Sequence, residues 1–142
     1  SQMYRKPKRC IVPTMGWYEW KSTSNGKEKY YIKREDNQPF VYAGLHNFCP
    51  GLNQHTFSVI TTAAADGLEE IHHRQPVAMG TEDMNAWLEG HLSEKDISEP
   101  TLNDQLVWYE VPNKPKSEKD FTKPVEEAEE IDDEDKQGDL FS

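Results

Sequence analysis

The chain has 142 residues and a formal net charge of −10, a length that suits one domain with its own hydrophobic core. Its two cysteines, Cys10 and Cys49, form no CxxC pair, which argues against a zinc ribbon or a disulfide scaffold and favours a reducing cytoplasm. No apolar run is long enough to span a bilayer, and no signal peptide opens the sequence. We therefore expect a soluble cytoplasmic protein with no membrane partner.

The acidic charge is concentrated at one end of the chain. Residues 117–142 hold eleven acidic and three basic residues, whereas residues 1–116 hold fifteen acidic and thirteen basic ones. Four of the basic residues lie close together near the N-terminus: Arg5, Lys6, Lys8 and Arg9. The body of the protein can thus present a basic face to nucleic acid although the whole chain is acidic.

Five strands are predicted in the first half of the chain. The apolar run 10–12 should end in a bend at Pro13, because proline cannot donate to a sheet. The Asn25-Gly26 pair predicts a tight hairpin turn. The remaining strands are expected in four β-branched or aromatic runs separated by polar turns: 17–20, 29–34, 40–46 and 55–62.

The second half contains the helical signals. Thr81 is a suitable N-cap for a helix over 82–89, which Gly90 should end. The helix is expected to bury three residues spaced three and four apart: Met84, Trp87 and Leu88. A second short helix is expected from Ser93, and a last strand over 105–111.

These elements predict an α+β fold that is mostly β. Short strands joined by hairpin turns favour antiparallel, strongly bent sheets forming a barrel-like core, with one or two peripheral short helices. This domain is expected to extend over residues 1–116. Residues 117–142 contain too few apolar side chains to bury a core, so we expect a disordered acidic tail.

Glu19 is the first candidate catalytic residue, because it is one carboxylate among the large rings of Trp17, Tyr18 and Trp20. Alternate residues of a strand point to opposite faces, so Glu19 should share a face with Trp17 and lie opposite Trp20. A partly apolar environment suits a general acid or base. The alternative is that Glu19 ends a strand and faces water.

Residues 71–77, IHHRQPV, form the second candidate group. On an extended backbone His72 and His73 should point to opposite sides, so only one of them can enter a given site. The five histidines of the chain also raise the alternative of a metal-dependent hydrolase. No HxH or HExxH spacing supports that alternative, and we predict no metal ligand and no cofactor.

Four blocks in a fixed order resemble the SOS-response-associated peptidase family, the abasic-site-processing proteins. The blocks are RCIVPTMGWYEWK, FVYAGLH, FSVITTAA and IHHRQPV. The family pattern is RC-x-x-P-x-x-G-[FW]-YEW, an AG[LI] strand, a TTAA-like segment and IH-x-R-M-P. The resemblance covers about residues 8 to 90, and it extends more weakly to the strand near Trp108.

The resemblance implies a specific chemistry. Members of the family hold single-stranded DNA with an abasic site and join an N-terminal cysteine to the ring-opened sugar as a thiazolidine. By position, Glu19 would assist proton transfer at the amine, and His72 would assist opening of the sugar ring. Arg74 matches an arginine that contacts the DNA backbone, and Trp20 and Thr61 match positions close to the DNA. Arg9 joins them as a basic residue beside the first block. Because Glu19 and Trp20 alternate, this assignment requires a strand end or bulge between them.

This chain also departs from the family pattern. The opening Met-Cys-Gly-Arg and an upstream Asn-Ala-Arg segment are missing, so the chain resembles the later part of the domain. Cys10 is internal and has no free amine, so this polypeptide alone should form no stable cross-link. Gln75 replaces the methionine before proline. Whether the chain is itself an enzyme, as the family's peptidase and cross-linking lyase activities imply, therefore stays open.

The last residues carry a separate signal. Gln137, Leu140 and Phe141 resemble the short motif by which bacterial replication and repair proteins dock on the sliding clamp. A tail of this kind can deliver two apolar side chains to a pocket on a partner. The alternative reading of the chain is thus a noncatalytic, monomeric DNA-repair interaction module tethered to the clamp, in a bacterial cytoplasm close to the nucleoid.

Overall fold

The computed structural model describes residues 6–114 and 122–125. Its strands in chain order are β1 (Lys8–Thr14), β2 (Gly16–Thr23), β3 (Gly26–Arg34), β4 (Phe40–Cys49), β5 (Gln54–Val59), β6 (Thr61–Ala63), β7 (Arg74–Pro76), β8 (Ala78–Met79) and β9 (Leu106–Val111). The helix α1 is Thr81–Leu88, and 3₁₀ turns occupy Leu68–Glu70, Asp96–Ser98 and Asn103–Gln105.

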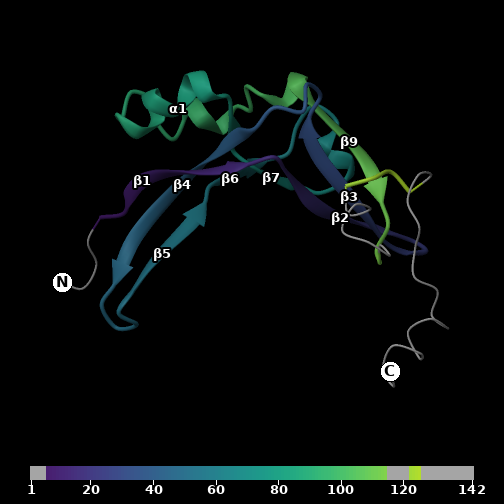
Figure 1. Cartoon of the computed structure of the whole chain (residues 1–142), viewed down its shortest axis with the longest axis horizontal. Helices are drawn as coiled ribbons and strands as arrows, with labels where there is room; N and C mark the ends of the chain where they lie inside the picture. Colours follow the sequence, from purple (N-terminus) through teal and green to yellow (C-terminus); the bar gives the residue numbers. More distant parts are fainter. Residues whose placement is uncertain (1–5, 115–121, 126–142) are drawn as a thin grey trace.

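The strands form three antiparallel sheets. One has the order β1-β4-β5 with β8 beside β4, the second has the order β2-β3-β9, and the third is the pair β6-β7. Figure 1 shows the two larger sheets descending as the two sides of an arch, with α1 above. The fold is α+β and mostly β, as predicted. The sheets of the described residues do not close into the expected barrel.

The bend that joins β1 to β2 lies two residues later than predicted. Pro13 stays in β1, opposite Val41, because β1 is an edge strand that pairs only with β4. The chain turns at Met15 instead. Gly16 then enters β2 at a point where a Cβ atom would lie 2.4 Å from the Ile32 carbonyl oxygen, so no larger residue fits without a shift.

The β2-β3 hairpin is confirmed, with its turn displaced by one residue. Ser24 and Asn25 form the turn, and Thr23 pairs with Gly26. Gly26 supplies the positive φ of 119°. The predicted strand over 55–62 is instead divided between β5 and β6, because the backbone of Ile60 bonds to Ala43 and Val77.

Helix α1 packs against β1 through Trp87, which is fully buried and donates its indole Nε1–H to the Cys10 carbonyl oxygen at 2.9 Å. Thr81 is the first helical residue rather than the cap, which is Gly80. The predicted buried stripe was wrong at Leu88, whose side chain is 43% exposed. Gly90 follows the helix with a φ of 82°, as expected for a stop.

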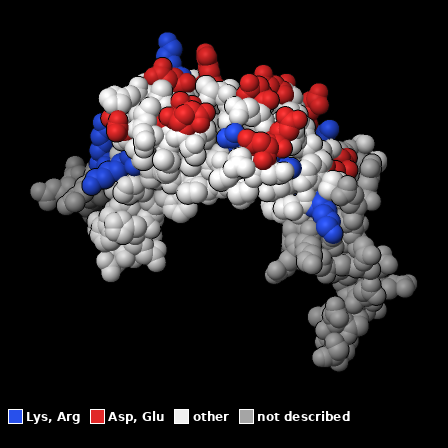
Figure 2. All heavy atoms as spheres, turned by 45° about the horizontal axis from the view of Figure 1, so that its top comes forward, with Lys and Arg blue, Asp and Glu red and all other residues white. Residues whose placement is uncertain are grey.

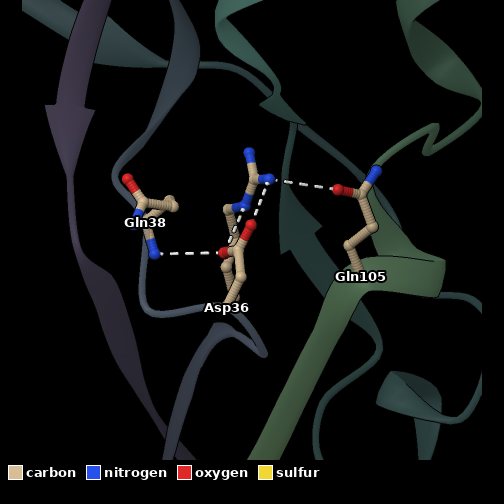
Figure 3. A network of polar contacts seen from close by, with 4 residues as sticks. Asp36, Gln38 and Gln105 are labelled. Carbon is tan, nitrogen blue, oxygen red and sulfur yellow. Dashed lines mark hydrogen bonds and ion pairs between the residues drawn. The ribbon is translucent and has the colours of Figure 1, made fainter.

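The turn after β3 is held by a charged network, shown in Figure 3. Arg34 donates two hydrogen bonds to the Asp36 carboxylate and one to the Gln105 side-chain oxygen. Asp36 also accepts the backbone N–H of Gln38. The Arg34 bonds, followed by that of Gln38, lower the pKa of the Asp36 carboxyl.

The predicted helix from Ser93 is a 3₁₀ turn at Asp96–Ser98, in which Ser93 and Asp96 cap each other reciprocally. The last strand begins one residue later than predicted. Most of the predicted acidic tail lies outside the described residues, including Gln137, Leu140 and Phe141. Arg5 lies outside them as well. No helix among the described residues is both long and apolar enough to cross a bilayer.

Candidate nucleic-acid interface

Arg74 and Thr61 are brought together by the pairing of β6 with β7. Thr61 lies opposite Pro76 and Ala63 opposite Arg74. The Arg74 guanidinium Nη2 donates to the Thr61 carbonyl oxygen at 2.8 Å and to its Oγ1 at 3.0 Å. Both residues are exposed. Arg74 is thus fixed by one nitrogen, and no carboxylate of the described residues pairs with it.

His72 is fixed by the backbone of Arg74. Its Nδ1 lies 3.2 Å from the Arg74 N–H and 3.0 Å from the Arg74 carbonyl oxygen. The prediction that His72 and His73 point to opposite sides was wrong, because the two rings pack with centroids 4.5 Å apart. The two histidines precede β7 and are not part of an extended strand, so the alternation rule does not apply to them.

A buried pair of side-chain amides holds the segment that carries His72 and Arg74. Gln75 is 2% exposed and Asn103 is 4% exposed. Their side chains exchange two hydrogen bonds of 2.8 and 2.9 Å. Gln75 also accepts the Ala65 N–H, and Asn103 donates to the Ala65 carbonyl oxygen. The amide at position 75 therefore ties β7 to the 3₁₀ turn before β9 and to the segment after β6.

Glu19 and Trp20 lie on opposite faces of β2, and no bulge separates them. The register runs unbroken through Glu19↔Tyr30 and Trp20↔Lys29, so the required bulge is not present. Glu19 is half-buried, and its Oε1 accepts the Trp20 backbone N–H at 3.3 Å. The carboxylate thereby reaches around the free edge of β2, which pairs only with β3.

The two candidate groups share a hydrophobic core although they come from different sheets. Trp17 precedes Glu19 by two residues, and Ile71 precedes His72 directly. Both Trp17 and Ile71 pack in the cluster that contains Phe40. Among the described residues, no hydrogen bond or ion pair joins Glu19 to His72. Their approach to a common cleft remains a prediction.

Tyr18 and Lys29 extend the exposed face of β2 and were not predicted as site residues. Tyr18 is 39% and Trp20 42% exposed. The Lys29 ammonium lies 4.4 Å from the Tyr18 ring centroid and 5.8 Å from that of Trp20. The hairpin register, which places Lys29 opposite Trp20, is the signal that could have identified this group.

Arg9 is engaged within the fold. Its guanidinium lies 4.0 Å from the centroid of the Trp87 ring. Its Nη1 donates to the carbonyl oxygens of Trp87 and Leu92. These contacts hold α1 against β1 and occupy the Arg9 guanidinium within the fold.

The metal-dependent alternative has no ligand set in the described part of the chain. Within residues 6–114 and 122–125, no three His, Cys, Asp or Glu side chains are grouped so that they could hold a metal ion. In that part of the chain, His72 and His73 therefore belong to no such group.

A family model and curated relatives with similar sequences point to the same protein family. The family model described as SOS response associated peptidase (SRAP) matches residues 1–117. The abasic site processing protein YedK of Escherichia coli is 32% identical over 110 residues, which are 72% of this chain and 50% of that protein. The abasic site processing protein YoqW of Bacillus subtilis is 33% identical over 119 residues, which are 76% of this chain and 53% of that protein.

Solved structures include a similar fold. A protein of Bacteroides thetaiotaomicron matches with a TM-score of 0.64 at 31% identity, over 75% of this chain and 50% of that one. This chain therefore spans about half the length of these bacterial relatives.

Proposed function

We propose that this chain, which belongs to the SOS response-associated peptidase family, acts in the response to DNA damage by recognising abasic sites in single-stranded DNA. Relatives that share about a third of its residues are named abasic site processing proteins. The observation that carries the proposal is the pairing of β6 with β7, which brings Arg74 onto Thr61, together with the contact of the His72 ring with the Arg74 backbone.

Arg74, Trp20 and Lys29 are the proposed contacts to the phosphates and bases of the DNA. Arg74 is anchored to Thr61 through one nitrogen and keeps its other N–H donors for a phosphate. Trp20 offers an exposed ring on which a base can stack, and Glu19 can serve the same DNA strand without a bulge because its carboxylate reaches the Trp20 N–H at the edge of β2. The ammonium of Lys29 beside that ring adds a positive charge to the same face.

Glu19 and His72 are the proposed proton carriers. When the His72 Nδ1 accepts the Arg74 N–H, its Nε2 carries the proton and can exchange it with the sugar. The Glu19 carboxylate is held at the free edge of β2 by the Trp20 N–H. We propose that His72 assists opening of the abasic sugar ring and that Glu19 assists proton transfer at the attacking amine. The thiazolidine itself forms on an N-terminal cysteine that these 142 residues do not contain.

A competition assay tests the recognition step. A labelled oligonucleotide with one stable abasic analogue is bound to the chain and displaced by unlabelled abasic or intact strands of the same sequence. We expect the abasic strand to compete at lower concentration, because an absent base leaves the sugar open to Glu19 and His72. Equal competition by the two strands would contradict abasic-site recognition.

We also propose, as an alternative role, that the tail tethers the chain to the bacterial sliding clamp. The support is the sequence of Gln137, Leu140 and Phe141. Burying one leucine and one phenylalanine contributes roughly 3 to 6 kcal/mol before ordering costs, which corresponds to weak, reversible binding. The whole chain should bind a clamp in a titration, and Leu140→Ala combined with Phe141→Ala should abolish binding. Binding unaffected by that double change would contradict the tether.

A further inference from the structure

A second surface with the chemistry of a nucleic-acid site lies on the β1-β4-β5 sheet, away from the residues assigned above. An open pocket of about 140 Å³ is formed where the start of β1 passes the β4-β5 hairpin. We call it the β-arm pocket. It is lined by Lys6, Lys8, His46, Asn47, Phe48 and His55.

The β-arm pocket is basic although the chain is acidic. The chain has 26 acidic residues, yet none occurs in 8–14 or in 40–59, the segments that form β1, β4, β5 and the turn between them. Within residues 6–114 and 122–125, no carboxylate pairs with Lys6 or Lys8. Figure 2 shows acidic side chains gathered over the top of the arch, whereas the visible face of the side formed by β4 and β5 carries none below that top. Among the residues that the structure describes, an anion approaching this side therefore meets two ammonium groups without a paired carboxylate.

An aromatic pair stands beside the lysines. Phe48 is 40% exposed, and its ring centroid lies 5.1 Å from that of His55 at an angle of 58°. The same hairpin exposes Phe57 by 64%. His55 supports one side of the Phe48 ring, and the solvent-exposed part of that ring offers a planar apolar surface at the mouth of a basic pocket. Phosphate charge and a flat base are the two features that such a combination recognises in single strands.

We propose that the β-arm pocket binds one nucleotide of single-stranded DNA, with Lys6 and Lys8 contacting its phosphate and Phe48 stacking on its base. The contact needs no lesion, because every nucleotide carries a phosphate and most carry a base. It goes beyond abasic-site recognition, since it lies on a different sheet from Glu19 and Trp20. The chain would then bind single-stranded DNA at two sites. One of them recognises the abasic site, and the other binds intact nucleotides as well.

Salt-dependent binding of an intact oligonucleotide to the whole chain tests the lysines. On a single strand, each phosphate contact contributes about −0.7 to the slope of log affinity against log salt. Because Lys6 and Lys8 contact the same phosphate, Lys6→Ala combined with Lys8→Ala should make the slope less negative by about 0.7. Lys95→Ala is the matched control, because Lys95 is an exposed lysine that precedes the 3₁₀ turn Asp96–Ser98 and does not line the pocket, and it should leave the slope unchanged.

Variants of Phe48 test the stacking. Phe48→Ala should weaken binding about fivefold or more, since one stacked base contributes about 1 kcal/mol or more. Phe48→Tyr should retain binding, and Phe48→Leu should not, because leucine keeps an apolar side chain but lacks a planar ring. An intact RNA strand, tested in parallel, should bind at this pocket as well if only phosphate and base are read.

Three results would overturn the proposal: no binding of intact strands by the unaltered chain, a lysine effect equal to that of Lys95→Ala, or an unchanged affinity of Phe48→Ala. The last result would leave the exposed ring to a protein partner instead. Failure of abasic-site recognition gives a different outcome, in which intact and abasic strands compete equally while both still respond to Lys6, Lys8 and Phe48.

Discussion

Arg74 combines a structural contact with a proposed DNA contact, and the two can be separated by substitution. Arg74→Ala removes both the bond to Thr61 and the charge. We expect it to make the salt slope of binding less negative by about 0.7. Arg74→Lys keeps the charge but loses the planar group that reaches Thr61 and a phosphate together, so the slope should remain while affinity falls. Identical slopes for the unaltered chain and Arg74→Ala would remove Arg74 from the interface.

Unlike substitution of Arg74, substitution of Arg9 should change the stability of the fold and not its binding to DNA. Its guanidinium covers the Trp87 ring and bonds to the last turn of α1, so Arg9→Ala should lower the free energy of unfolding by about 1 to 3 kcal/mol. The salt slope of DNA binding should stay as it is in the unaltered chain. Urea unfolding and anisotropy titrations check the two parts. A reduced slope without a loss of stability would return Arg9 to the DNA-binding surface.

Tyr42 links stability to alkaline pH. Burial raises the pKa of its phenol from 10.0 to about 12. The folded chain then retains a proton that the unfolded chain releases, so stability is complete below about pH 10 and declines as pH rises through about 12. Between about pH 9 and about pH 11, the unaltered chain should lose roughly 1.4 kcal/mol more than Tyr42→Phe. If urea unfolding showed that the unaltered chain and Tyr42→Phe lose the same free energy of unfolding between these two pH values, Tyr42 would ionise as freely in the folded chain as in the unfolded one.

Strand β7 is anchored by one buried pair of side-chain amides, Gln75 and Asn103. Gln75→Met leaves the Asn103 amide without its main partners in a buried site. We expect a cost of about 1 to 3 kcal/mol in the free energy of unfolding. Adding Asn103→Leu to Gln75→Met should restore part of this loss, because no unpaired amide is then buried.

A double-mutant cycle over Gln75 and Asn103 measures that coupling. The sum of the two single losses should exceed the loss in the double variant by about 0.5 kcal/mol or more. Strict additivity would mean that the two amides do not act as a pair. His72 and Arg74 flank Gln75, so a loosened β7 should also weaken DNA binding.

Local signals in the sequence were sufficient for several elements. The Asn25-Gly26 pair correctly predicted a hairpin, and the aromatic run 17–20 and the runs 29–34 and 40–46 are strands. Four blocks of residues identified the family, because their order along the chain is more specific than any one block. Glu19 was already a candidate from its position among aromatic side chains, whereas the roles of Thr61, His72 and Arg74 came from those blocks.

Features set by distant residues were missed. Ile60 divides a run of strand-forming residues because Ala43 and Val77, far away in the sequence, bond to its backbone. Pro13 remains in its strand because β1 has a free edge, which only the sheet order reveals. Leu88 is exposed because α1 turns Trp87 toward β1. In each case tertiary packing overrides a local preference.

At the scale of the whole molecule, the arch separates two surfaces with different roles. The side formed by β2 and β3 carries the exposed Tyr18 and Trp20, whereas the side formed by β4 and β5 carries the β-arm pocket (Figure 1). The β6-β7 pair holds Thr61 and Arg74 near the top of the arch. A single DNA strand bound at both surfaces would run across the molecule. The affinity for DNA should therefore rise with oligonucleotide length until both surfaces are occupied.

Backbone amide chemical shifts, followed while an abasic or an intact single strand is added, test the proposed recognition most directly. Signals of Lys8 and Phe48 should move with both strands. Signals of Glu19, His72 and Arg74 should move more with the abasic strand, because they contact the open sugar and its neighbouring phosphate. Equal shifts of Glu19, His72 and Arg74 with the two strands, or no shift at these residues, would contradict the recognition of abasic sites by this face.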